Sequence, residues 1–502
     1  MCKAIQRVVI LGGGSAGWLS ALSFKRGLPQ LDVTLVQSAE IPVIGVGEST
    51  TDFIPHFLHN ILGLDRKQFY EEVRPSWKLG NKFLWGHPDD SHFHYTFDHV
   101  MDTEVLGMDK RSAFFCLDDF RDASHSCALM DRDLAPCLLT PNGSYAVQEA
   151  FGYHIPNRAF LDYLKRKAEE LGVTLIEGEV NAAPQDASGN VTSLDLVDGR
   201  SVGGDLFIDA SGFKSLLIDG VLEEPLVSYD RSLFCDSAVI GGWPRDGKIL
   251  PYTTAETMEH GWCWRIEFLD QVTRGYVFSS AFCDVDAAVA ELKDKNPELT
   301  GDVRTMRFRS GRRQCYWRGN VAAIGNAAGF VEPLEATALH MIIEQAWSMV
   351  LILRDSNCRP PQVMIDKENE RYGRLWDDIR DFLALHYKFN TRCDSPFWQH
   401  CRQETPLGNA EELVDFYRLA GPSRVCDAYI PPGSIFGYNG YLLILVGQRV
   451  KTQYQNRFNA SQLQTWELHR AGIRRDIANT VPVREGLQIV RDPGWVWPSI
   501  GV

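Results

Sequence analysis

The segment that most constrains the fold is VVILGGGSAGW at residues 8–18, where an apolar strand runs directly into a glycine-rich turn. Gly12, Gly14 and Gly17 stand there in G-x-G-x-x-G spacing. The first glycine permits the tight bend, the second lets the backbone approach a pyrophosphate, and the third lets helix and strand pack closely. The helix that starts with Ser15 and Ala16 then presents its N-terminus to the anion. The segment predicts a site for FAD or NAD.

Because such a glycine triplet also occurs as a purely structural turn, the rest of the unit matters. A second strand at residues 32–36 follows after about 15 residues, as a compact βαβ crossover requires. Gln37 stands where an acidic residue usually binds the ribose. Its amide can exchange hydrogen bonds with ribose hydroxyls, without the charge of a carboxylate. The strand context favours nucleotide binding over the structural turn.

The composition narrows the class of protein further. Of the 502 residues 44% are apolar, and the net charge of -14 argues against general nucleic-acid binding. The absence of any uninterrupted apolar run of membrane-spanning length predicts no transmembrane helix. Twelve cysteines without C-x-x-C pairs indicate reduced thiols in a cytoplasmic protein. We expect no metal site, because no carboxylate stands at ligand spacing from the histidine cluster, which consists of His87, His92, His94 and His99.

Three segments, 5–50, 150–215 and 305–345, carry Val/Ile/Leu runs beside small-residue turns and predict one α/β nucleotide-binding layer. The insertions at about 80–150 and 220–300 contain alternating aromatic pieces typical of an antiparallel sheet over the substrate. A long apolar helix is expected from Ala338, ending before Pro360. We therefore expect a dinucleotide-binding module with an inserted sheet over 1–345 and a mainly helical substrate-pocket region over 346–502.

Further motifs specify which nucleotide fold this is. The sequence FIDASGFKSL at 207–216, which contains Asp209, looks like the second fingerprint of FAD-dependent monooxygenase-type folds. The sequence IGNAAGFVEPLEATA at 324–338 looks like the third, and it includes Gly325 and Asn326. Both motifs assign the nucleotide site to FAD and the fold to the Rossmann-like flavin monooxygenase type.

These motifs occur together with Lys78 in the sequence WKLG, with GWCWRIE at 261–267, and with GVGEST at 45–50. The combination resembles the flavin-dependent halogenases of the tryptophan-halogenase family over essentially the full chain. In that family the last motif links the flavin and substrate sites, which implies that Gly47, Glu48 and Ser49 contact the cofactor. Two positions depart from the family pattern: Glu267 replaces a proline, and Ala338 replaces a glycine.

The resemblance implies an enzyme that uses FADH2, O2 and chloride or bromide to halogenate a free electron-rich aromatic. A flavin C4a-hydroperoxide would oxidise the halide to hypohalous acid, which Lys78 would present to the ring, either by a hydrogen bond or as a haloamine. Glu335 would stabilise or deprotonate the cationic ring intermediate. Backbone N–H groups of Thr337 and Ala338 would hold the halide, a role that does not depend on the side chain at 338.

Trp262 and Trp264 alternate on one strand and would form an aromatic wall between flavin and substrate. The substrate is expected to contact Phe93, His94, Phe97 and Trp398, all of which could equally be core aromatics. Chain length and the altered tryptophan motif suggest similarity to free-phenol halogenases, such as the phloroglucinol halogenases of pyoluteorin clusters, and hence a phenolic substrate in antibiotic biosynthesis or other secondary metabolism.

Three alternatives stay open: a tryptophan or indole halogenase, an FAD-dependent aromatic hydroxylase, and a flavin-binding protein without catalysis. The family takes FADH2 from a separate flavin reductase, which is the expected partner besides the small aromatic substrate. The sequence leaves the oligomeric state open.

Overall fold

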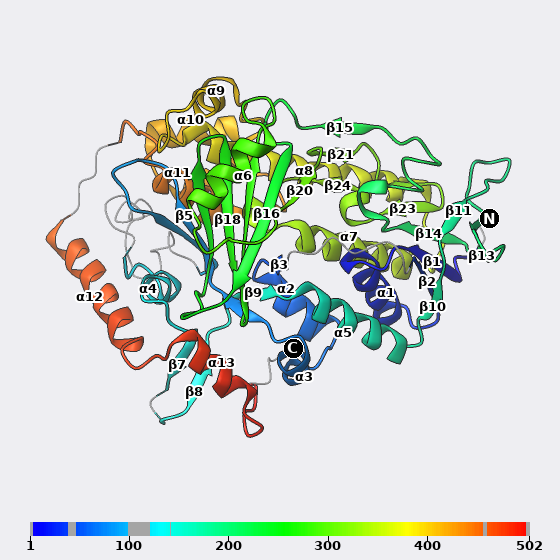
Figure 1. Cartoon of the computed structure of the whole chain (residues 1–502), viewed down its shortest axis with the longest axis horizontal. Coiled ribbons are helices and arrows are strands. Elements are labelled where there is room, and N and C mark those ends of the chain that lie inside the picture. The colour runs from blue at the N-terminus through cyan, green and yellow to red at the C-terminus, as the bar shows by residue number, and fades with distance from the viewer. Residues whose placement is uncertain (1–3, 39–46, 99–120, 141, 455–458, 498–502) are drawn as a thin grey trace. The chain divides into compact units, whose positions relative to one another are not determined.

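The structure is a computed structural model that describes residues 4–38, 47–98, 121–140, 142–454 and 459–497. Gly45 and Val46 of the GVGEST motif and His99 of the histidine cluster lie outside the described residues. The chain forms two compact units, whose elements can be followed in Figure 1. Unit 1 consists of Met1–Val73, Pro156–Ser228 and Arg309–Trp376, and unit 2 consists of Arg74–Ile155, Tyr229–Phe308 and Asp377–Val502.

Unit 1 contains the expected nucleotide-binding sheet, with six strands in the order β10-β2-β1-β14-β23-β22. All neighbours pair in parallel except β22 and β23, which pair antiparallel. The strands are β1 (Arg7–Leu11), β2 (Asp32–Gln37), β10 (Thr174–Glu177), β14 (Leu206–Asp209), β22 (Trp317–Arg318) and β23 (Val321–Ala323). Four of the five β1 residues are buried, as expected for a strand covered on both faces.

Helices cover this sheet and close unit 1. Helix α1 (Ser15–Gly27) packs against α5 (Asn157–Glu170) and α7 (Ala338–Asp355). The other helices of the unit are α2 (Phe53–His56), α3 (Arg66–Glu72) and the first part of α8 (Gln362–Phe389). Its short strands are β3 (Glu48–Ser49), β11 (Val180–Ala182), β12 (Ser193–Leu196), β13 (Ser201–Gly203), β15 (Leu226–Ser228), β21 (Gly311–Arg313) and β24 (Gly329–Phe330).

Unit 2 is built on a seven-stranded sheet in the order β20-β16-β19-β18-β17-β5-β6, drawn mainly in green in Figure 1. Its strands are β5 (Gly80–Leu84), β6 (Phe93–Thr96), β16 (Ser237–Pro244), β17 (Thr253–Met258), β18 (Gly261–Glu267), β19 (Gln271–Phe278) and β20 (Arg304–Arg307). The expected antiparallel sheet therefore joins both insertions. One junction differs from expectation, because β17 and β5 pair in parallel.

Helix α6 (Val285–Asp294) covers one face of this sheet. Its Ala288 and Leu292 pack with Val239, Cys263 and Tyr276 in a buried cluster. The remaining strands of unit 2 are β4 (Ser76–Lys78), β7 (Cys137–Leu139), β8 (Tyr145–Val147) and β9 (Gly152–Ile155). Its remaining helices are α4 (His125–Asp131), α9 (Pro396–Glu404), α10 (Ala410–Ala420), α11 (Gly437–Gly447), α12 (Ala460–Asp476) and α13 (Val483–Arg491).

The division of the chain differs from the expected boundary at residue 345. Unit 1 continues to Trp376, because α7 packs along α1: a Cβ built on Gly27 would lie 2.2 Å from Val350. The inserted segments belong to unit 2 together with the later helices. Residues 346–502 are mainly helical as expected, and no helix in the described part of the chain is long and apolar enough to cross a bilayer.

Candidate active site

The glycine turn after β1 has the geometry that pyrophosphate binding requires. Gly12 has a φ of +122°, and a Cβ there would lie 2.2 Å from the Ala210 carbonyl oxygen. A Cβ on Gly17 would lie 1.9 Å from the Gly12 oxygen, so only glycine lets α1 approach the turn. At Gly14, by contrast, an added Cβ meets no atom within 4 Å. Gly12 and Gly17 therefore serve the turn, whereas Gly14 faces open space.

The first turn of α1 is available to an anion. Gly14 is its N-cap and supplies no side-chain hydrogen bond, so the N–H groups of Ser15, Ala16 and Gly17 lack a capping side chain. The partial positive charge of the helix N-terminus lies at the same place. Together with the open space at Gly14, these groups fit the pyrophosphate of FAD.

The three nucleotide motifs converge at the carboxyl ends of neighbouring parallel strands. Gly12 abuts Ala210 of the second motif, and a Cβ on Gly325 of the third would lie 2.9 Å from the Cβ of Ala16. Gly325 has a φ of +67°, and its N–H donates to Gln345 Oε1 at 3.2 Å. Ligands of open α/β sheets bind at this edge. Asn326 is half-buried there and lines a small cavity, described below.

Two other predicted cofactor residues have different surroundings. Asp209 is fully buried, and its carboxylate accepts hydrogen bonds from the N–H groups of Ser211, Leu217 and Ile218 at 2.8–3.1 Å. This carboxylate therefore shapes the loop of the second motif. Gln37 ends β2, and a Cβ on Gly13 would lie 2.1 Å from its Oε1. The Gln37 amide thus lies against the glycine turn, where a ribose would be bound.

The segment Gly47–Thr51 contributes an acid and a contact to α7. Burial raises the pKa of Glu48 to about 7. Thr51 Oγ1 lies 3.0 Å from His340 Nδ1, in the first turn of α7. Burial lowers the pKa of His340 to about 4, so this ring is neutral at physiological pH. A lone histidine gave no signal in the sequence, and His340 was not among the expected site residues.

Glu335 lies in a strained turn at the start of α7. It ends a 3₁₀ turn, Pro333–Glu335, and is 4% exposed. Ala336 follows with a φ of +57°, in the left-handed region that non-glycine residues rarely adopt. Thr337 is then the N-cap of α7 and supplies no side-chain cap. The turn aims the uncapped N–H groups of the helix at the space beside it.

A small cavity lies at this helix start. Its volume of about 10 Å³ is about the space that one water molecule needs. Thr337 and Ala338, the two predicted halide residues, line it together with Gly325, Asn326, Gly329, Phe330, Val331, Met341 and Trp376. The cavity therefore joins the third flavin motif to the N-terminus of α7, which favours an anion.

In unit 2, Lys78 is held at the end of β4, opposite Gly152 of β9. The side chain is 1% exposed, and its Nζ lies 5.4 Å from the centre of the Phe97 ring. His154, also in β9, is fully buried, and its Nε2 lies 2.8 Å from Thr253 Oγ1. Burial, and secondarily the charge of Lys78, lower the pKa of His154 to about 3. A neutral histidine thus accompanies the buried lysine, which the sequence did not indicate.

Trp262 and Trp264 lie on one face of β18, as the alternation predicts, with ring centres 6.0 Å apart. A Cβ on Gly275 of the neighbouring β19 would lie 1.9 Å from the Trp264 ring, so this glycine makes room for the indole. The two tryptophans are 1% and 5% exposed. Their geometry fits the expected aromatic wall.

Glu267, which replaces the family proline, is fully buried at the end of β18. Its carboxylate pairs with Arg245 and with Arg265, whose Nε lies 2.7 Å away. Its backbone oxygen accepts a 2.7 Å hydrogen bond from Ser76 Oγ in β4. Ser76 and Lys78 share a face of that strand. The departure from the family pattern therefore places a buried, paired carboxylate at the end of β18, whereas the bond to Ser76 comes from the backbone and does not depend on the side chain at 267.

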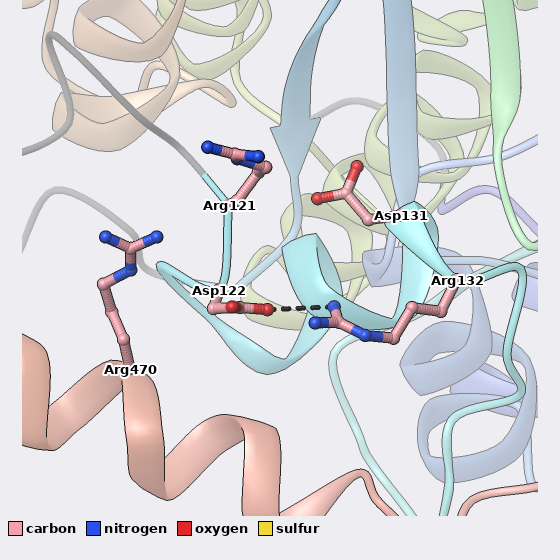
Figure 2. A pocket seen from close by; sticks show the side chains of 5 residues that line it. All are labelled: Arg121, Asp122, Asp131, Arg132 and Arg470. Carbon is pink, nitrogen blue, oxygen red and sulfur yellow. Dashed lines mark ion pairs between the residues drawn. The ribbon is translucent and has the colours of Figure 1, made fainter.

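The expected substrate contacts differ in their surroundings. Phe97 lies against Lys78, as described. Phe93 is 3% exposed and stacks on Phe83 with ring centres 5.0 Å apart, so it packs as a core residue. Trp398 is fully buried, donates from Nε1 to the Met258 oxygen at 2.7 Å and stacks on Tyr387. His94 is buried, and its Nε2 lies 3.6 Å from an Asp131 carboxylate oxygen. Asp131 in turn lines the pocket that Figure 2 shows.

Comparison with known proteins identifies the family. A family model described as tryptophan halogenase matches residues 7–463. Tryptophan 7-halogenase RebH of Lentzea aerocolonigenes is 32% identical over 447 residues, which cover 83% of each chain. Tryptophan 6-halogenase ThaL of Streptomyces albogriseolus is 30% identical, over 84% of this chain and 83% of that one.

Solved structures agree with this assignment. The crystal structure of MibH, a lathipeptide tryptophan 5-halogenase, has a TM-score of 0.89 and 36% identity, covering 98% of this chain and 94% of that one. BrvH, a flavin-dependent halogenase from Brevundimonas sp. BAL3, has a TM-score of 0.84 and 28% identity, over 97% and 99% of the two chains. The expected FAD-binding Rossmann-like fold is confirmed. The chain belongs to the tryptophan-halogenase family and is a flavin-dependent halogenase.

Proposed function

We propose that this enzyme uses reduced FAD, O2 and chloride or bromide to halogenate an indole ring, either of tryptophan or of a tryptophan-containing compound. The observation that carries the halogenation part of the proposal is the match of residues 7–463 to the tryptophan-halogenase family. This match favours halogenation over the hydroxylase alternative. We place the halide at the N–H groups that start α7, beside the small cavity lined by Thr337 and Ala338.

The relatives favour indole over the phenol that chain length suggested. The curated relatives named above are tryptophan 7- and 6-halogenases, and the solved structure at 36% identity is that of a lathipeptide tryptophan 5-halogenase. Their names differ in the ring position and agree on the ring. We therefore propose that the halogenated ring is an indole. The ring position that is halogenated is to be determined by experiment.

The residues predicted from the motifs take distinct roles. When bound, reduced FAD supplies, with O2, the oxidising equivalents that turn halide into an electrophile. Its pyrophosphate binds the Gly12–Gly17 turn, and the halide binds the N–H groups at the start of α7. Lys78 holds the electrophilic halogen by its ammonium or as a haloamine, and its burial keeps bulk water from the reacting atoms. Glu335 stabilises the ring cation.

The electrons come from a separate flavin reductase. The sequence contains one G-x-G-x-x-G fingerprint, and FAD takes it. No second dinucleotide motif is present for NADH or NADPH. We expect the purified enzyme to leave NADH unused and to accept FADH2 from an added reductase.

The test is a product assay with reductase-supplied FADH2, O2 and bromide or chloride. The substrate panel contains free tryptophan, a tryptophan-containing peptide, a simple indole and phloroglucinol, and mass spectrometry detects halogenated product. We expect halogenated indole. Halogenated phloroglucinol alone would return the assignment to phenols, a hydroxylated product would support the hydroxylase, and no product with any member would support a flavin-binding protein without catalysis.

A further inference from the structure

Two histidines and an aspartate meet in unit 2. His92 directly precedes β6, His94 lies in β6, and Asp131 ends α4. His92 Nε2 lies 3.3 Å from Asp131 Oδ1, and His94 Nε2 lies 3.6 Å from the same oxygen. All three ligand atoms lie within 4.8 Å of one another. Asp131 is 37 residues from His94, so ligand spacing in the sequence gave no signal for it.

Of the three residues, His94 has the surroundings that most favour a bound ligand. Its side chain is 2% exposed, and within the described residues its buried Nε2 has no hydrogen-bond partner. A buried polar nitrogen of this kind costs free energy unless something binds it. This nitrogen faces the Asp131 carboxylate at a distance too long for a hydrogen bond.

The imidazole ring of His92 also lies with its Nε2 toward the Asp131 carboxylate. His92 Nδ1 lies 3.0 Å from Ser91 Oγ. His92 Nε2 also lies 3.3 Å from Asp131 Oδ1, to which an Nε2–H donates when no metal is bound. Metal binding would require the proton on Nδ1 instead, where Ser91 Oγ accepts it. Metal-binding histidines commonly have such an oriented second nitrogen. Both histidines can therefore direct Nε2 to one point beside the carboxylate.

The neighbouring cations are mostly engaged elsewhere. Arg132 adjoins Asp131 in the chain, but its Nη1 pairs with Asp122 at 2.9 Å, and Asp122 also accepts Arg474 at 3.0 Å. Lys82 stands opposite His94 in the β5–β6 ladder, with its Nζ 5.3 Å from the centre of the Tyr252 ring. Its charge opposes a cation at the cluster, whereas the carboxylate of Asp131 attracts one. Asp131 is thus left to the two histidines.

The cluster is reachable from solvent. Asp131 lines an open pocket of about 510 Å³ together with Arg121, Asp122, Arg132 and Arg470. In Figure 2 a dashed line joins Asp122 to Arg132, whereas none joins Asp131 to the arginines drawn. The pocket gives an ion an entry path and leaves room for water as a further ligand. Three protein ligands with an open fourth position are a familiar zinc coordination set.

We propose that His92, His94 and Asp131 bind one divalent metal ion of the zinc class. Tetrahedral zinc with bonds of about 2.0–2.1 Å places its ligand atoms about 3.3 Å apart, close to the two histidine–aspartate separations of 3.3 and 3.6 Å. The two histidine nitrogens must approach each other by up to about 1.5 Å, since all three ligand atoms lie within 4.8 Å of one another. The ion would tie α4 to β6 and so fix the strand that leads to Phe97 beside Lys78.

The test is Zn²⁺ binding to EDTA-treated full-length enzyme, measured by equilibrium dialysis and by the shift in Tm. We expect one Zn²⁺ per chain and a higher Tm with Zn²⁺. His94→Gln keeps a polar side chain but removes the ligand, and should weaken binding by at least about 100-fold and abolish the shift. His92→Ala tests the same site at a half-buried position, where the fold is less at risk. Co²⁺ in place of Zn²⁺ should give a visible absorption spectrum that both variants lose.

The matched control is His125→Ala. His125 begins α4 and its Nε2 lies 3.3 Å from Asp476, the same separation as in the proposed site, on an exposed surface. This variant should keep the stoichiometry and affinity of the wild type. No bound Zn²⁺ in the wild type, or equal affinity in the wild type, His94→Gln and His92→Ala, would overturn the proposal, whether or not the chain halogenates indole.

Discussion

At the scale of single residues, the glycines of the nucleotide turn separate folding from binding. Gly17 is needed for packing, because its added Cβ would lie 1.9 Å from the Gly12 oxygen, whereas Gly14 has no atom within 4 Å of that position. Sequence spacing identified both as glycines of one motif. Only the structure distinguishes the glycine that the fold requires from the one that faces open space.

Gly14→Ala and Gly17→Ala are therefore a matched pair. Gly14→Ala should change the free energy of unfolding of the FAD-free enzyme by at most about 1 kcal/mol, as for an N-cap substitution, while weakening FAD binding. Gly17→Ala should lower stability more. Thermal denaturation and fluorescence titration with FAD measure the two effects. Equal loss of stability in both variants would contradict this distinction.

Glu335→Gln tests the charge of a buried carboxylate at nearly constant size. Glu335 is 4% exposed, and removal of its charge should slow halogenated product formation by on the order of 10²-fold. Oxidation of FADH2 should be little changed, since the flavin binds through other residues. Single-turnover product yield against flavin absorbance measures both. Wild-type product yield would mean that Glu335 only starts the turn before α7.

Of the two departures from the family pattern, Glu267 and Ala338, Glu267 has the clearer structural explanation. It is fully buried and pairs with Arg245 and Arg265. Glu267→Ala leaves Arg245 buried without its partner and should lower the free energy of unfolding by about 3–5 kcal/mol. The control is Glu170→Ala, an exposed residue paired with Arg166, which should cost less than about 1 kcal/mol. Similar losses in both variants, by urea denaturation, would refute a structural role for Glu267.

At the scale of elements, the patterns with strong periodicity were predicted well. The long helix was expected from Ala338 and begins there as α7, and the tryptophans of β18 share a face. Contacts between distant segments could not be predicted. Phe93 and Trp398 pack in the core of unit 2, and the parallel β17–β5 pairing depends on which strands meet. A single sequence gives the period of an element but not its neighbours.

The segment around Glu48 should make stability depend on pH. Its pKa is raised from 4.5 to about 7, so the folded state favours the neutral acid. This contribution is present below pH 4.5 and is lost as the pH rises through 7. In FAD-free enzyme, Glu48→Gln should reduce the fall in Tm between acidic and neutral pH. Substitution of exposed Glu71 by Gln is the control. An identical pH profile of wild type and Glu48→Gln would contradict the assignment.

At the scale of the whole molecule, the three nucleotide-binding segments expected from the sequence correspond to unit 1, and both insertions contribute to the sheet of unit 2. The compact units do not divide at residue 345, because α7 and the start of α8 pack with the nucleotide unit. The candidate site shows the same difference between what motifs predict and what only the fold reveals. Motifs predicted Lys78 and Glu335 as site residues, which stays a prediction, whereas His154 and Asp131 became visible only where the fold brought them beside other groups.

The central claim is that flavin oxidation and halogen transfer are separate tasks, and that Lys78 carries the second. The most direct measurement is the ratio of halogenated product to FADH2 oxidised, in wild type and Lys78→Ala, with FAD affinity measured in parallel. Lys78 lies in unit 2, outside the nucleotide-binding segments. We therefore predict normal FAD binding and FADH2 oxidation in the variant with no halogenated product. Undiminished product from Lys78→Ala would contradict the account.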